Sequence, residues 1–270
     1  VRDRWQRERF WGVRVEWAKA LGANASAAAV DALVDALTAE SDLRVLEGLL
    51  RACMDIRDPM LAEAVIERLR KRLPHRATMV AWEFLGQQRQ EAPFDELEAA
   101  SARESYNGFA QAGALRGLAA TRDRRAVDIL IARTRVGVTN NRARPAAAVA
   151  LGTLARRLDK RDREAAIERL VDLLRDPVPR MQLSAVAGLE AARATEAIGA
   201  LETFRRRVTL QEAVRVDAVL ADLRQGGEPR LAGAEKELEE LRDKLRKLEQ
   251  RLEKLQARVE VDAGEADRTS

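Results

Sequence analysis

His75 and Cys53 are the chain's only histidine and its only cysteine, and this restricts the chemistry that the chain can perform. A His-Glu-x-x-His zinc motif needs two histidines, and a disulfide or a cysteine-based zinc site needs at least two cysteines. A Ser-His-Asp triad would have to use His75, which follows Pro74 in a stretch expected to be a loop between helices. We interpret His75 as a solvated loop residue and Cys53 as a small buried side chain. The sequence predicts no catalytic, cofactor-binding or metal-ligating residue, and no cofactor within these residues.

Basic residues are the second candidates for a function, because they could bind nucleic acid. Before Gly226 there are 38 basic and 32 acidic residues, a net charge of +6, and from Gly226 onward there are 10 basic and 12 acidic, a net charge of −2. The densest basic stretches are Arg68, Arg70, Lys71, Arg72 and Arg76, and then Arg205, Arg206 and Arg207. Both stretches lie near expected helix ends, where cations complement the helix dipole. Nucleic-acid binding along an arginine-lined face is therefore only a third hypothesis, and we do not expect it.

Aromatic residues gather at the start of the chain, where Trp5, Phe10, Trp11 and Trp17 are four of its ten aromatics. They could form a stacking platform for a ligand or a base. The favoured interpretation places Trp17 in a hairpin core and uses Phe10 and Trp11 to cover a junction with whatever precedes residue 1. Tyr106 and Phe109, at the start of another expected hairpin, are also interpreted as packing residues.

An internal repeat decides the predicted fold. Small-residue helices ending on leucine recur with a period in the low to high thirties, and 33 and 38 residues separate Leu118, Leu151 and Leu189. The full series of these leucines is Leu21, Leu50, Leu85, Leu118, Leu151, Leu189 and Leu220. Each copy precedes a second helix with its own apolar stripe, such as Val30, Leu33, Val34 and Leu37 on one face. We therefore predict an all-α, right-handed α-α superhelix, a HEAT-like solenoid of six to seven hairpins over residues 1–225.

Two further features of the sequence support stacked hairpins. Alanine and glycine on the first helix of each pair would let successive pairs pack closely. Proline-containing stretches that interrupt helices lie where the chain is expected to turn between hairpins, at Asp58-Pro59, Ala92-Pro93 and Asp176–Pro179. Proline suits the first turn of a helix, and aspartate can cap it.

The end of the chain has a different pattern, which begins after a Gly- and Pro-containing linker at 226–230. Apolar residues alternate in steps of three and four over residues 231–260, with Leu238 at heptad position a and Leu241 at position d, which predicts a coiled-coil helix. Its partner is left open: the helix could pair with a second copy in parallel, or fold back on the solenoid. Residues 261–270 are polar and predicted to form a disordered tail.

Several strings resemble the C-terminal helical-repeat region of gluzincin zinc aminopeptidases of the membrane-alanyl (puromycin-sensitive) type. They are Phe10–Glu16 (FWGVRVE) running into Ala18–Gly22 (AKALG), then Glu104–Asn107 (ESYN) followed by Gly113–Leu118 (GALRGL). A Lys/Glu/Leu-rich tail like Glu235–Arg258 also occurs in some of these proteins. The resemblance covers nearly the whole chain.

The resemblance implies that this chain is the non-catalytic cap or docking scaffold of a zinc aminopeptidase. The zinc-binding motif and the Gly-x-Met-Glu-Asn motif of that family are absent from these residues. The resemblance therefore places the catalytic domain and its zinc upstream of Val1, as the partner of this region, and the missing start Met is consistent with this expectation. The alternative is a stand-alone HEAT-repeat interaction scaffold that its coiled coil dimerises. The longest apolar run, Ala146–Gly152, is far shorter than a membrane span, so no membrane partner is expected, and the cellular compartment stays open.

Overall fold

The computed structural model describes residues 2–225 and contains no strand among them. The chain divides into two units, residues 1–220 and residues 221–270, and only the last turn of the final described helix belongs to the second. The predicted linker at 226–230, coiled coil at 231–260 and tail at 261–270 lie outside the described residues.

The helices follow one another with short connections. In chain order they are α1 (Arg2–Arg7), α2 (Trp11–Asn24), α3 (Ala27–Ala39), α4 (Leu43–Ala52), α5 (Pro59–Arg70), α6 (His75–Gln87), α7 (Phe94–Ala102), α8 (Phe109–Thr121), α9 (Ala126–Arg133), α10 (Arg144–Ala155), α11 (Lys160–Leu173), α12 (Pro179–Ala191), α13 (Ile198–Arg205) and α14 (Leu210–Gln225). Short 3₁₀ turns at Arg89–Glu91, Tyr106–Gly108 and Thr195–Ala197 precede α7, α8 and α13.

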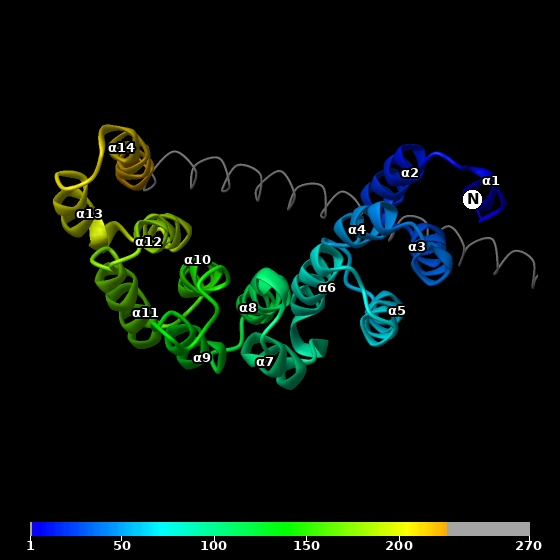
Figure 1. Cartoon of the computed structure of the whole chain (residues 1–270), viewed down its shortest axis with the longest axis horizontal. Helices are drawn as coiled ribbons and strands as arrows, with labels where there is room; N and C mark the ends of the chain where they lie inside the picture. Colours follow the sequence, from blue (N-terminus) through cyan, green and yellow to red (C-terminus); the bar gives the residue numbers. More distant parts are fainter. Residues whose placement is uncertain (1, 226–270) are drawn as a thin grey trace, which may run out of the picture. The chain divides into compact units, whose positions relative to one another are not determined.

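Successive helices form hairpins that stack in sequence order. Each odd-numbered helix from α3 to α11 contacts the even-numbered helix that follows it, and α4, α6, α8, α10 and α12 lie along one side of the stack with α5, α7, α9 and α11 along the other (Figure 1). Neighbouring even helices contact each other directly. We call the surface of α6, α8, α10 and α12 that points away from the odd helices the even-helix face. The predicted all-α superhelix of stacked hairpins is confirmed for residues 2–220.

The predicted apolar positions form the interior of this stack. The repeat leucines lie on the even helices, and all of them are buried except Leu21, which is half-buried in the first hairpin. On α3, the stripe residues Val30, Leu33 and Leu37 are buried and Val34 is half-buried. A helix hairpin alone cannot cover both of its apolar sides, so each one depends on its neighbours.

Capping residues explain where several helices begin. Oδ1 of Asp58 accepts hydrogen bonds from the amides of Met60 (2.9 Å) and Leu61 (3.1 Å), and Pro59 is the first residue of α5, as predicted. Ser26 caps α3 and Asp159 caps α11 in the same way. Pro179 opens α12 as predicted.

Glycines set how closely the even helices approach. A β-carbon on Gly86 of α6 would lie 2.1 Å from the carbonyl oxygen of Gly117 on α8. One on Gly152 of α10 would lie 1.9 Å from the carbonyl oxygen of Gly188 on α12. Side-chain atoms cannot occupy such positions, so the backbones of these helices touch. The close stacking that the small residues predict is therefore present.

Candidate functional site

The structure places the chain's only cysteine and its only histidine in different environments, one buried and one exposed. Cys53 is fully buried beside α4, and its burial raises the pKa of the thiol to about 12, which makes it unreactive. His75 is exposed as expected, but it is the first residue of α6 rather than a loop residue, because Pro74 ends the turn and the helix starts at once. Its ring stacks on Tyr106, with centroids 4.7 Å apart. Among residues 2–225, no group of three or more His, Cys, Asp or Glu side chains could hold a metal ion.

The two dense basic stretches lie at helix ends, as predicted, and have structural partners. Arg68 of α5 donates from its guanidinium to the carbonyl oxygens of Leu37 and Glu40, which joins α5 to the end of α3. Arg76 forms an ion pair with Glu47 at 3.4 Å, and Arg205 at the end of α13 pairs with Asp217 of α14. Arg68, Arg76 and Arg205 are therefore engaged in contacts between elements of the stack.

The N-terminal aromatics pack in pairs. Trp5 of α1 is buried against Trp17, with ring centroids 6.3 Å apart, so Trp17 packs partly on the segment before the first hairpin. Phe10 is 59% exposed, and its ring lies 5.8 Å from that of Trp11. Tyr106 is 64% exposed, so its packing is limited to the stack on His75.

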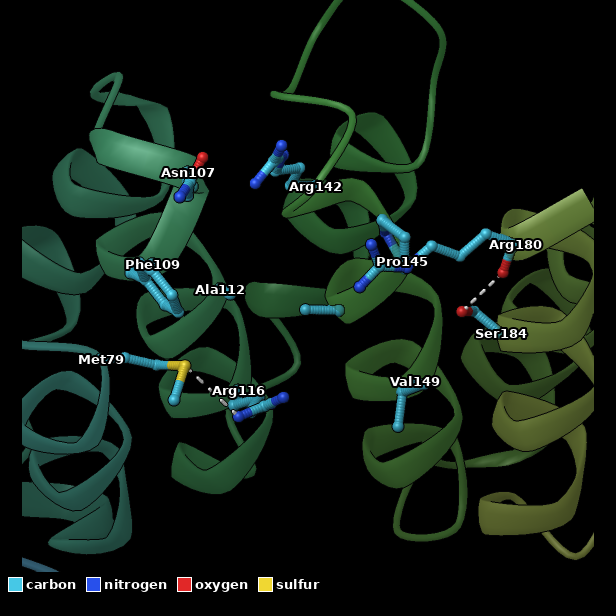
Figure 2. A pocket seen from close by; sticks show the side chains of 12 residues that line it. Met79, Asn107, Phe109, Ala112, Arg116, Arg142, Pro145, Val149, Arg180 and Ser184 are labelled. Carbon is cyan, nitrogen blue, oxygen red and sulfur yellow. Dashed lines mark hydrogen bonds between the residues drawn. The ribbon is translucent and has the colours of Figure 1, made fainter. Parts of the chain in front are cut away.

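A pocket of about 420 Å³ opens on the even-helix face, where α8, α10 and α12 begin. Its lining residues are Met79, Asn107, Gly108, Phe109, Ala112, Arg116, Arg142, Pro145, Ala146, Val149, Arg180 and Ser184. Figure 2 shows Phe109 and Arg116 on the α8 side, Arg142 and Pro145 at the start of α10, and Arg180 with Ser184 on the α12 side. Apolar surface from three successive hairpins therefore lies between three arginines.

The pocket is electropositive. No acidic residue lines it, and among the described residues neither Arg142 nor Arg180 forms a salt bridge, although both are exposed. Arg116 is 3.3 Å from a carboxylate oxygen of Glu83 on α6, outside the lining. The residues that precede α8, α10 and α12 make no side-chain cap to the helix amides, and uncapped N-termini add positive partial charge.

A buried ion pair positions two walls of this pocket. Arg144, the first residue of α10, donates through Nε to the carbonyl oxygen of Thr134 (2.6 Å) and through Nη1 to Asp176 Oδ1 (3.3 Å). Asp176 also accepts from the amide of Val178 at 3.0 Å, just before α12. The predicted role of Asp176 as a simple breaker was incomplete, since its carboxylate joins the start of α10 to the start of α12.

The electrostatics of Asp176 fit this role. Burial disfavours its charged form, but the hydrogen bonds from Arg144 and the Val178 amide outweigh burial and lower the pKa of the carboxyl. Both partners are therefore charged at neutral pH. The ion pair therefore fixes the start of α10, beside Arg142, to the start of α12, beside Arg180. The side chains of Arg142 and Arg180 take no part in it and remain available to bind a ligand.

The pocket could not be predicted from dense basic runs, because none lies in the residues that line it. The pocket arginines are isolated in the sequence, but Arg142 and Arg180 each stand nine residues before a repeat leucine, Leu151 and Leu189. Phe109 stands nine residues before Leu118. Aligning the repeats on their leucines and asking which exposed positions carry the same charge would have found two of the three arginines.

No helix among residues 2–225 is long and apolar enough to cross a membrane. No family model matches the chain, and no curated protein matches it. Among solved structures, human deoxyhypusine hydroxylase in complex with glycerol is similar at 18% identity and a TM-score of 0.40, covering 80% of each chain. An engineered protein is similar at 20% identity and a TM-score of 0.34, covering 82% of this chain and 94% of that one. At these values, neither similarity indicates an activity for this chain.

Proposed function

We propose that this chain is a non-catalytic binding scaffold that holds a protein partner on its even-helix face. The observation that carries the proposal is the pocket at the starts of α8, α10 and α12, where apolar side chains and two exposed arginines without an ion pair lie together. Arginines elsewhere in the stack, such as Arg68 and Arg144, hold hairpins together, whereas Arg142 and Arg180 have no such task. Stacked repeats offer extended surfaces of this kind to partners.

Site-specific photo-crosslinking tests this proposal in the native host. A benzophenone amino acid replaces Val149, which lines the pocket, and in a matched variant it replaces Glu168, which is exposed on α11 of the opposite side. Both variants are first checked for an unchanged thermal unfolding midpoint. We expect a discrete crosslinked product from position 149 and none from position 168. No product at 149, or the same products from both positions, would contradict the scaffold.

The cap of a zinc aminopeptidase is the second candidate. The observation that favours it is Phe10, a large apolar side chain that is 59% exposed beside Trp11 and that an upstream domain would cover. The test is the coding sequence upstream of Val1. A His-Glu-x-x-His motif there supports the cap, and its absence ends this candidate without affecting the scaffold.

Self-association through residues 231–260 is a separate proposal, since those residues lie outside the described part of the chain. Sedimentation of the full chain and of a chain ending at 230 compares their masses. A dimer that becomes a monomer on truncation supports the coiled coil, and equal association states contradict it.

A further inference from the structure

We propose that the pocket at the starts of α8, α10 and α12 binds an acidic peptide segment, with Arg142 and Arg180 as the residues that bind its carboxylates. This inference rests on the proposed scaffold function and specifies its partner. Three arginines and no acidic residue line the pocket, and the guanidiniums of Arg142 and Arg180 have no carboxylate partner among residues 2–225. Guanidinium groups bind carboxylates with two parallel hydrogen bonds, which gives both strength and orientation.

The apolar surface between the arginines favours a peptide over a nucleic acid. Met79, Phe109, Pro145 and Val149 line the pocket beside the charged side chains. A peptide that carries both acidic and apolar residues can fill both kinds of surface. Duplex DNA is held mainly through many phosphate contacts, and here the two other basic stretches lie at helix ends with Arg68, Arg76 and Arg205 already engaged.

The repeat geometry also sets a spacing for the carboxylates. Arg142 stands two residues before α10 and Arg180 is the second residue of α12, and each stands nine residues before a repeat leucine. Axes of packed helices lie roughly 8–10 Å apart. A chain in polyproline II conformation advances about 3.1 Å per residue and has three residues per turn, so carboxylates three residues apart lie on one face and about 9 Å apart. The inferred ligand is therefore a segment in polyproline II conformation with an acidic residue at about every third position.

Fluorescence anisotropy on the full chain tests this inference. The probe is a fluorescein-labelled peptide of four Glu-Ala-Leu repeats, and its control has Gln in place of Glu. The pocket variant is R142Q/R180Q, which disturbs no ion pair among the described residues. The matched variant is R175Q/R206Q, which removes two exposed arginines outside the pocket lining and for which no ion pair is seen.

We expect the Glu peptide to bind, the Gln peptide to bind at least about tenfold more weakly, and R142Q/R180Q to weaken the Glu peptide about tenfold or more. R175Q/R206Q should change the affinity by less than about twofold, since exposed charges outside the site act weakly. The inference is overturned if the Glu peptide does not bind, if both double variants lose affinity equally, or if the Gln peptide binds as well. It is also overturned if a duplex DNA of about 20 base pairs binds more tightly than the peptide and depends on Arg142 and Arg180.

The crosslinking experiment separates this inference from the scaffold function. A specific product at position 149, together with no effect of R142Q/R180Q on that product or on peptide binding, would overturn the acidic ligand and leave the scaffold intact. Loss of both the product and the peptide binding in R142Q/R180Q, with R175Q/R206Q unchanged, would support both.

Discussion

Arg144 and Asp176 form an ion pair between two successive hairpins, and their side chains are only 3% and 5% exposed. The pair spans 32 residues of sequence and joins the first residue of α10 to the segment that leads into α12. Because the pocket arginines Arg142 and Arg180 flank these two points, the ion pair links the stability of the stack to the shape of the binding surface.

Replacing Asp176 with asparagine should destabilise the stack by about 3–5 kcal/mol, because Arg144 would keep its charge in a buried site without a partner. Urea unfolding followed by helical circular dichroism measures the loss. The control is Asp172→Asn, an exposed position of α11, which should change stability by less than about 0.5 kcal/mol. Equal urea midpoints for Asp176→Asn and Asp172→Asn would show that the buried ion pair stabilises the fold no more than an exposed aspartate does.

The contact between Gly152 and Gly188 makes a second prediction. A Gly152→Ala variant would place a methyl group 1.9 Å from the Gly188 carbonyl oxygen, so α10 and α12 must separate, at a cost of about 1–3 kcal/mol or more. Gly199→Ala is the matched control, since a β-carbon on this α13 residue meets nothing within 4 Å. That variant should be neutral or more stable by up to about 1 kcal/mol, because alanine favours helix. Thermal unfolding measures the midpoints of both variants. A Gly152→Ala protein with the same midpoint as the unchanged protein would contradict the close contact.

The hairpins could be predicted from sequence because their signals are local. The stripe at Val30, Leu33 and Leu37 reports one helix face within two turns, the leucine series shows that such helices recur along the chain, and Asp58-Pro59 marks a helix start by itself. The Arg144–Asp176 pair could not be predicted, since many arginines and aspartates lie at comparable separations and only the packing of α10 on α12 selects these two.

The candidate site was hidden for a related physical reason. The residues of the pocket wall come from four segments of the chain, around α6, α8, α10 and α12, so no single stretch of sequence has a composition that indicates binding. The densest basic runs in the sequence lie elsewhere, around Arg68 and Arg205, and these two side chains contact neighbouring elements. The stacking of equivalent positions brings the isolated Arg142 and Arg180 to one face.

Acid should weaken the fold as the pH falls from about 5 to about 2. The pKa of Asp42, the capping residue of α4, is lowered to about 2 by the hydrogen bond from the Arg44 side chain, with further hydrogen bonding from the Arg44 amide. Arg144 lowers the pKa of Asp176 despite its burial. A carboxyl whose pKa is lower in the folded state stabilises the fold above its unfolded pKa, and that stability is lost as the pH falls through the folded value.

Urea midpoints measured from pH 7 to pH 2 test this prediction. They should be nearly constant down to about pH 5 and then fall. The fall should be smaller in Asp42→Asn, whose stability at pH 7 is already reduced by loss of the charged cap. A midpoint that stays constant to pH 2 would contradict the role of these carboxylates.

Cys53 provides a probe of local opening in the hairpin of α4 and α5. It is fully buried, and its thiol has a pKa of about 12, so almost no thiolate exists at pH 8 and reagents cannot reach the sulfur. The native protein should therefore react with a disulfide reagent such as dithionitrobenzoate far more slowly than the urea-unfolded protein does. Stopped-flow absorbance measures both rates, and equal rates would mean that Cys53 is accessible in the folded chain.

Gly152→Ala disturbs a contact between α10 and α12, several hairpins away from Cys53, and in a solenoid each hairpin stabilises only its nearest neighbours. The rate at which Cys53 reacts with the reagent should accordingly rise less in Gly152→Ala than in Leu49→Ala, because the latter removes a buried side chain of α4 and leaves a cavity beside that helix.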